Sequence, residues 1–221
     1  MEYAERRRKS AAPLLFGSAE ATHETFPTSL LRFPPVPSTL RRWVPCTFEK
    51  LVGLLAAGRI PYALVGAMAL NEYGYRRVTV DVDILFAREG LEAFKRAHLG
   101  RGYVEKVPGS RGMRDTEHGV DIDVVLAGEY PGDGKAKPVA FPDPATAAIE
   151  GARVRLLPLP KLIELKLASG MSAPHRLRDL ADVLEIIRLQ QLPEDFAARL
   201  DPFVRDKFRE LWQAAQHADQ E

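Results

Sequence analysis

The residues best suited to chemistry are two pairs of aspartates, each spaced as Asp-x-Asp inside an apolar segment that alternates like a β-strand. The pairs are Asp81 and Asp83 in RVTVDVDILF (77–86), and Asp121 and Asp123 in GVDIDVVLAG (119–128). Because successive side chains of a strand point to opposite faces, each pair lies on one face, opposite valines and isoleucines. Neighbouring carboxylates repel each other and raise each other's pKa unless a cation lies between them.

Oxygen ligands of this kind suit a divalent cation, because Mg²⁺ is held in proteins by one or two carboxylates together with substrate phosphates. If the two strands are neighbours, three or four carboxylates meet, which is enough for two metal ions about 3.5–4 Å apart. The alternative is a sheet face on which the aspartates simply remain solvated. Two such strands in one domain favour the metal site.

A glycine turn precedes the first pair. The segment ALVGAMALNEYG predicts the end of a buried strand (61–66) and then a short helix (67–74). Free backbone N–H groups at a helix N-terminus bind phosphate, and Gly66 lets a phosphate approach the backbone. An anion site next to a cation site makes up the two halves of a nucleoside-triphosphate site.

These segments together resemble the nucleotidyltransferase (polymerase-beta-like) superfamily. In that family a strand that ends in Gly-Gly or Gly-Ser is followed by Asp-hydrophobic-Asp and, on a later strand, by a third acidic residue. This chain has Ala67 in place of the usual second Gly or Ser, so phosphate would rest more on backbone N–H groups. The resemblance implies one set of metal ligands and one set of triphosphate contacts. The metal ligands are Asp81, Asp83 and Asp123, with Asp121 kept as the other choice for the third carboxylate, and the triphosphate contacts are Gly66 and Ala67.

The C-terminal part of the sequence predicts three helices, over residues 160–170, 175–191 and 201–217. Lys166 falls within the apolar face of the first, where a lysine either extends its amine to solvent or reaches an anion; spacing leaves both open. On the second helix Asp179 flanks the apolar side chains, whereas Asp182 lies further outside.

The segments IELKLASG and HRLRDLADVLEII resemble the Lys…Arg-x-x-Asp region of the AbiEii-type and related toxin–antitoxin nucleotidyltransferases. This narrower resemblance covers roughly residues 60 to 190. It implies that Lys166 contacts phosphate and that Asp179 orients this lysine or a substrate group.

Composition excludes few functions and indicates a globular protein. The 221 residues are 46% hydrophobic and 28% charged, with a net charge of +1, which gives no global attraction to nucleic acid or membranes. The single cysteine, Cys46, excludes an internal disulfide, fits a reducing cytoplasm and is expected to be a small buried side chain. With apolar runs far short of a membrane span and no signal-peptide pattern, a cytoplasmic protein without a membrane partner is predicted.

Three regions are predicted: a loosely ordered arm over residues 1–42, a nucleotidyltransferase core over 43–142 and a helical subdomain over 143–221. The expected fold is α+β, a mixed sheet flanked by helices and followed by the C-terminal helices. The implied activity is Mg²⁺-dependent transfer of a nucleoside monophosphate from a triphosphate such as ATP to a hydroxyl of RNA, tRNA or protein, with two ions when the triphosphate is bound. A toxin–antitoxin role with a cognate partner fits the resemblance. The alternative is an inactive module on this fold that binds a nucleotide or a protein.

Overall fold

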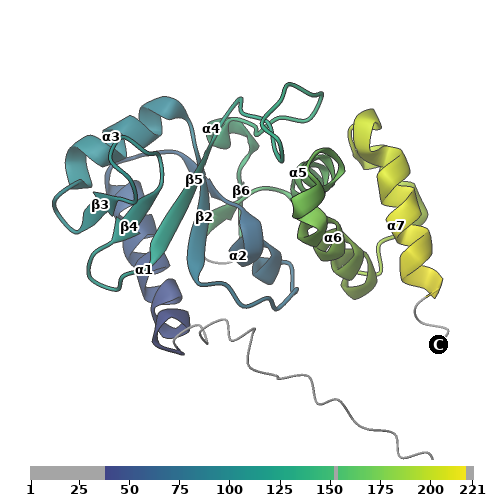
Figure 1. Ribbon diagram of the computed structural model, residues 1–221, viewed down its shortest axis with the longest axis horizontal. Coiled ribbons are helices and arrows are strands. Elements are labelled where there is room, and N and C mark those ends of the chain that lie inside the picture. Colours follow the sequence, from purple (N-terminus) through teal and green to yellow (C-terminus); the bar gives the residue numbers. More distant parts are fainter. Residues whose placement is uncertain (1–37, 152–153, 218–221) are drawn as a thin grey trace, which may run out of the picture. The chain divides into compact units, whose positions relative to one another are not determined.

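The computed structural model describes residues 38–151 and 154–217, so the arm predicted over residues 1–42 lies almost entirely outside the described residues. The strands are β1 (Tyr62–Leu64), β2 (Asp81–Phe86), β3 (Tyr103–Glu105), β4 (Met113–Asp115), β5 (Asp121–Leu126), β6 (Ile149–Glu150) and β7 (Arg155–Leu156). They form one sheet in the order β3-β4-β5-β2-β1-β7-β6 (Figure 1). Strand β2 is parallel to β5 and β1 is parallel to β7, while the other pairs are antiparallel. The predicted mixed sheet is confirmed.

Helices flank this sheet and make up most of the C-terminal part. They are α1 (Ser38–Ala57), α2 (Gly66–Glu72), α3 (Arg88–His98), α4 (Pro144–Ala147), α5 (Leu159–Ser172), α6 (Leu177–Leu189) and α7 (Arg205–His217). Short 3₁₀ turns cover Pro174–Arg176, Glu194–Arg199 and Pro202–Val204. None of the helices in the described residues is both long and apolar enough to cross a membrane.

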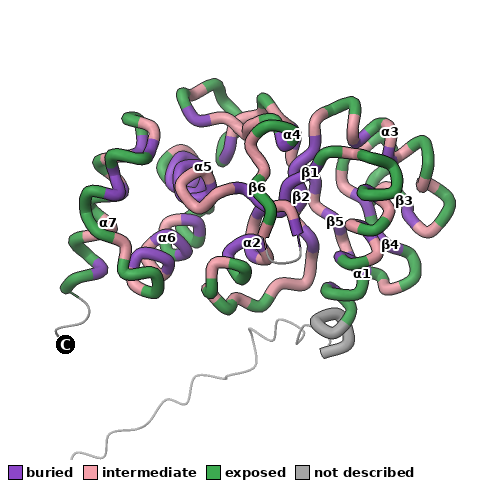
Figure 2. The backbone as a smooth tube through the Cα atoms, turned by 180° about the vertical axis from the view of Figure 1, so that it is seen from behind, coloured by how far each residue is buried: buried purple, intermediate pink, exposed green. Residues whose placement is uncertain are grey.

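One face of the sheet is closed by α1 and α3. The alternating residues Val82, Ile84 and Phe86 of β2 are fully buried on this face. Phe94 of α3 stacks on Phe86, and its ring also meets the edge of Tyr103 on β3. Figure 2 shows the buried strands behind α1 and α3. This apolar layer fixes the opposite, aspartate-bearing face of β2.

Helix α1 begins at Ser38, within the last residues of the predicted arm, and it contains Pro45. Cys46, which was expected to be buried, is exposed, so that expectation was wrong. The helix buries Thr47, Phe48 and their apolar neighbours against the sheet, and the cysteine lies on the other side.

Helix α5 is the centre of the C-terminal helices, and each of its residues from Leu162 to Gly170 is buried. Gly170 was predicted to end the helix but lies inside it. A residue without a side chain is needed there because α6 packs so close that a Cβ would be 2.5 Å from Cγ of Leu180. On the far side of α6, Phe208 of α7 stacks on Phe196 and closes a second apolar layer. The described residues, 38–151 and 154–217, belong to one compact unit, and the division at 142/143 stays a prediction.

Candidate active site

The two aspartate pairs lie side by side because β2 and β5 are adjacent and parallel. In their register Asp83 is the partner of Asp123, and Asp81 is the partner of Asp121. Neighbouring strands are about 4.8 Å apart, and residues in register on them share a face. Both strands bury the residues between the aspartates and leave the aspartates partly exposed. The predicted meeting of four carboxylates on one sheet face is therefore present.

The first turn of α2 contacts the Asp83 carboxylate. Gly66 has φ +63, and a Cβ built on it would lie 1.9 Å from Oδ2 of Asp83, so only glycine fits here. The backbone N–H of Val65 donates to the Asp83 carbonyl at 3.1 Å, which fixes the strand beside this turn. The N–H of Ala67 donates to the Asp83 side chain. The turn predicted for phosphate thus also borders the predicted metal ligand.

The electrostatics of Asp83 are those of a carboxylate that lacks a counter-charge. Burial, followed by repulsion from Asp81 and Asp123, raises its pKa to about 6. The positive charge of Lys166 and the hydrogen bond from Ala67 act in the opposite direction but do not cancel these effects. A cation bound between the carboxylates would remove this repulsion, so the donor set fits a divalent metal ion.

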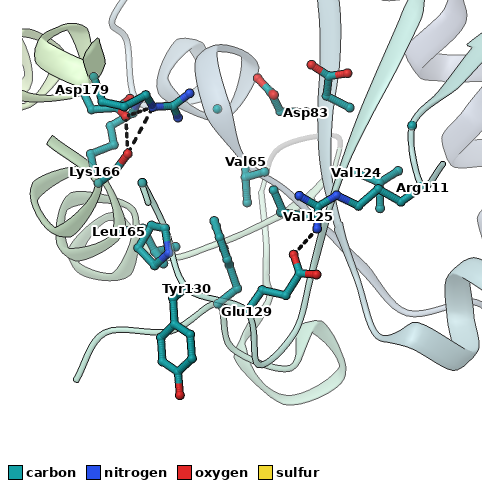
Figure 3. Close-up of a pocket in the computed structure, with 18 of the residues that line it drawn as sticks. Val65, Asp83, Arg111, Val124, Val125, Glu129, Tyr130, Leu165, Lys166 and Asp179 are labelled. Atoms are coloured by element: carbon teal, nitrogen blue, oxygen red, sulfur yellow. Dashed lines mark hydrogen bonds and ion pairs between the residues drawn. The ribbon is translucent and has the colours of Figure 1, made fainter. Parts of the chain in front are cut away.

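A cavity of about 580 Å³ lies between this sheet face and α5 and α6 (Figure 3). Of the predicted site residues, it is lined by Gly66, Asp83, Asp123, Lys166 and Asp179. Asp81 and Ala67 are not among the lining residues. In Figure 3 Asp83 lies on the sheet side, and Lys166 with Asp179 lies on the helical side. One cavity therefore contains both the carboxylates and the lysine predicted to serve a triphosphate.

Lys166 does not extend to solvent; it is buried in an ion-pair network. Its Nζ lies 2.7 Å from Oδ2 of Asp182 and 3.1 Å from Oδ1 of Asp179. The interpretation that Asp182 lies outside the apolar arc was wrong, because its side chain is 2% exposed and it makes the shorter contact. That interpretation considered α6 alone, whereas the lysine of α5 packs onto α6 at this point.

Asp179 is held by three donors. Besides Lys166, its Oδ2 accepts from Ser169 Oγ at 2.7 Å and from Arg176 Nε at 2.9 Å. Burial raises the pKa of Asp179, but the charge of Lys166, the Ser169 hydrogen bond and Arg176 together hold it below its usual value. Asp179 is therefore an anion held between Lys166, Ser169 and Arg176 at the cavity wall.

Three basic side chains around the cavity were given no role from the sequence, although one of them, Arg176, is the arginine of the Arg-x-x-Asp pattern. Lys106, just after β3, places Nζ 2.8 Å from Oδ1 of Asp123 and 3.0 Å from Oδ2 of Asp121. Arg111 donates to Glu129 at the cavity rim (Figure 3). Arg176 also lines the cavity. No periodic signal marks Lys106 or Arg111, because both lie in the short hairpin between β3 and β4.

The carboxylates differ in how strongly they are engaged. Asp121 is bridged by Lys106 and, at 2.6 Å, by Arg114 Nε, whereas Asp123 is paired with Lys106 alone and its side chain is 47% exposed. Asp81 accepts from the Thr79 hydroxyl. Asp123 is thus the more accessible choice for a third metal ligand, and Asp121 the more saturated one.

A separate cluster lies on α1 and around the β4–β5 turn. Within residues 38–151 and 154–217, one group of three metal-type side chains, Asp115, Glu117 and His118, has ligand atoms within 4.8 Å of one another. The oxygens of Asp81, Asp83 and Asp123 are not gathered that closely. Lys50 places its ammonium 2.8 Å from both Asp115 and Glu117, so this cluster already contains a cation. Its geometry joins α1 to the sheet.

Comparison with solved structures gives the fold its name. The crystal structure of ANT(2'')-Ia in complex with adenylyl-2''-tobramycin matches with a TM-score of 0.50 at 14% identity, over 75% of this chain and 96% of that one. The chain has a nucleotidyltransferase fold. The comparison also finds the solution structure of ANT(2'')-Ia, with a TM-score of 0.48 at 14% identity, over 79% of this chain and 96% of that one. It further finds an H. pylori protein described as a nucleotidyltransferase, with a TM-score of 0.46 at 16% identity, over 80% of this chain and 93% of that one. No protein-family model and no curated sequence matches the chain.

Proposed function

We propose that the protein transfers a nucleoside monophosphate from a nucleoside triphosphate to a hydroxyl group and releases pyrophosphate, with Mg²⁺ as cofactor. The observation that carries this proposal is the in-register pair Asp83 and Asp123, which shares one cavity with the buried Lys166. The nucleotidyltransferase fold supports the reaction class. Asp81, Asp83 and Asp123 would hold the metal, two ions when the triphosphate is bound, and the metal would neutralise charge on the phosphates.

The chain's own residues position and neutralise the reactants. Lys166 presents its ammonium to the phosphates, and Asp179 fixes its direction. The N–H groups of Gly66 and Ala67 contact the triphosphate. As the acceptor oxygen bonds to the α-phosphorus, the bond to the pyrophosphate oxygen breaks, and the half-exposed Asp123 accepts the hydroxyl proton.

For the acceptor, we propose RNA, tRNA or a protein hydroxyl, as the similarity to AbiEii-type enzymes implies, with a toxin–antitoxin role beside a cognate partner. A small-molecule acceptor is the competing choice, because ANT(2'')-Ia is seen with an adenylylated aminoglycoside.

The test is incubation of the purified protein with each α-labelled triphosphate, Mg²⁺ and one acceptor class at a time: total tRNA, a protein extract or an aminoglycoside set. Label that moves to one class supports the transfer reaction and names the acceptor. Asp83→Asn is the control and should abolish transfer. Wild-type protein that binds no triphosphate under any of these conditions contradicts the proposal.

A second candidate is a nucleotide-binding module without transfer activity. Lys106 supports it, because this lysine occupies the space between Asp121 and Asp123 where a cation would bind. Calorimetric binding of Mg²⁺-triphosphate by wild-type protein, without label transfer to any acceptor, would select this alternative. Lys106→Ala would then bind Mg²⁺ more tightly and still transfer nothing.

A further inference from the structure

Arg77 and Lys166 share one oxygen atom. Nη1 of Arg77 lies 2.6 Å from Oδ2 of Asp182, and Nζ of Lys166 lies 2.7 Å from that same oxygen. Asp182 is almost fully buried, so bulk water does not compete with Arg77 and Lys166 for its carboxylate. Two donors that share one acceptor oxygen each bond to it less strongly than one donor alone.

Arg77 reaches Asp182 of α6 from the part of the chain that carries the sheet. It lies in the segment between α2 and β2, where Asn71 fixes its backbone: the Arg77 N–H donates to Oδ1 of Asn71 at 2.7 Å and the Asn71 amide donates to the Arg77 carbonyl at 3.1 Å. Its side-chain Nε is buried without a hydrogen-bond partner, so the Asp182 ion pair is what anchors the guanidinium. Arg77 is not among the residues that line the cavity.

The charges of this network do not balance. Two carboxylates, Asp179 and Asp182, face three cations, Lys166, Arg77 and Arg176. Of the cations, Lys166 and Arg176 line the cavity and Arg77 does not. Removing Arg77 would leave two carboxylates with two cations, and this ion-pair network would lose its excess positive charge.

We propose that Arg77 is a positioning residue for Lys166: by taking part of Asp182's charge, it leaves the lysine ammonium available to an anion in the cavity. The inference rests on the proposed function in that the anion is the triphosphate. Arg77 lies four residues before Asp81 in the sequence, so the same segment that leads into the metal-binding strand also adjusts the phosphate-binding lysine. The two halves of the site are thereby linked by one side chain.

The first test is Mg²⁺-ATP affinity, measured by calorimetry at fixed ionic strength and well below the melting temperature of each variant. Arg77→Gln should weaken binding about tenfold, because a charge-assisted bond and one unit of net charge are lost. Arg77→Lys, which keeps the charge, should return to within about threefold of wild type. Arg76→Gln is the matched control: its side chain is exposed next door, and affinity should not change. Arg77→Gln with reduced thermal stability but wild-type affinity would overturn the proposal.

A double-mutant cycle asks whether the effect passes through Lys166. In a Lys166→Ala background, Arg77→Gln should weaken binding no further, because the side chain that it positions is gone. Equal losses in both backgrounds would mean that Arg77 acts on the anion directly, and the positioning role would be rejected.

The third test needs no nucleotide and so separates this inference from the proposed function. Brief acetylation with acetic anhydride, read by mass spectrometry, gives the labelling of Lys166 relative to Lys161 on the same helix. In Arg77→Gln, Lys166 no longer shares Asp182 with a second cation, so its ion pair with Asp182 becomes stronger. The labelling of Lys166 relative to Lys161 should therefore fall severalfold. An unchanged or higher ratio overturns the inference, whether or not the wild-type protein binds ATP. A lower ratio without any ATP binding would support it and reject the proposed function alone.

Discussion

The substitution Asp83→Asn should stabilise the metal-free protein. Asp83 is crowded by Asp81 and Asp123, while Lys166 and the Ala67 N–H favour its ionised form. Asparagine keeps the shape and the oxygen that accepts from Ala67 but carries no charge. The repulsion in the metal-free site should therefore disappear without creating an unsatisfied partner.

The magnitude follows from the pKa. Burial and the neighbouring carboxylates raise the pKa of Asp83 from 3.8 to about 6. The native state therefore holds this proton more tightly than the unfolded state, and ionisation lowers stability as pH rises from about 4 to 6. A shift of this size corresponds to at most about 3 kcal/mol, and the solvent that reaches the cavity reduces it to about 1–2 kcal/mol. For a protein of this length that raises Tm by about 2–8 °C.

The assay is a set of melting curves in EDTA at pH 4 and pH 8, repeated at pH 8 with Mg²⁺ and ATP. In EDTA at pH 8 the variant should melt higher than wild type, and at pH 4 the two should coincide. With ligand near a hundred times its Kd, wild type should gain about 2.7 kcal/mol and the variant almost none. A lower melting temperature for Asp83→Asn in EDTA at pH 8 would refute the reasoning, because Asp83 would then be an anchor of the fold.

Three further substitutions test the surroundings of the site. Gly66→Ala should lower the free energy of unfolding in urea by about 2–4 kcal/mol and abolish ATP binding, because the new Cβ would overlap Asp83 and φ is positive. Gly100→Ala is the control, because Gly100 has φ +75 but no atom within 4 Å of the added Cβ. It should cost about 1 kcal/mol. Asp121→Asn should have the opposite sign to Asp83→Asn. Burial raises the pKa of Asp121, but Arg114 and Lys106 together hold it below its usual value. Asp121→Asn should therefore lose less than about 1 kcal/mol of stability at pH 8. This loss should vanish as pH falls below the usual aspartate pKa, so the melting curves of variant and wild type should converge. Asp115→Asn removes the charge of a fully buried carboxylate that pairs with the partly exposed Lys50, and it should cost about 1–3 kcal/mol, while calorimetry of the folded fraction gives unchanged ATP affinity.

The sequence was informative where a strong local pattern exists. The Asp-x-Asp segments alternate clearly, and both became strands whose aspartates share a face. Strands β4, β6 and β7 were not predicted, since two or three residues are too few to show a period. The prediction that Gly66 lets a phosphate approach the backbone stays a prediction; the group that lies close to it in the structure is the Asp83 carboxylate.

What the sequence could not supply was the set of partners brought by tertiary packing. Lys106 meets Asp123 because a hairpin folds back over β5, and Asp182 meets Lys166 because α5 crosses α6. A helical projection of α6 alone places Asp182 outside the apolar arc. Gly170 shows the same limit: glycine usually ends a helix, but here it admits a neighbouring helix.

The position of Lys106 has a consequence for how the chain folds. Sheet closure brings Asp121 next to Asp81 and Asp123 next to Asp83, which would assemble like charges during folding. The hairpin residue Lys106 places its ammonium next to Asp121 and Asp123, so these carboxylates are partly neutralised without a metal ion. The sheet can therefore form before any metal ion binds. Any metal that later binds Asp123 enters by exchange with this tethered cation. The Lys106 side chain must then turn away from Asp123, while its backbone stays hydrogen-bonded to Gly112, and metal binding is expected to change the solvent exposure of this lysine.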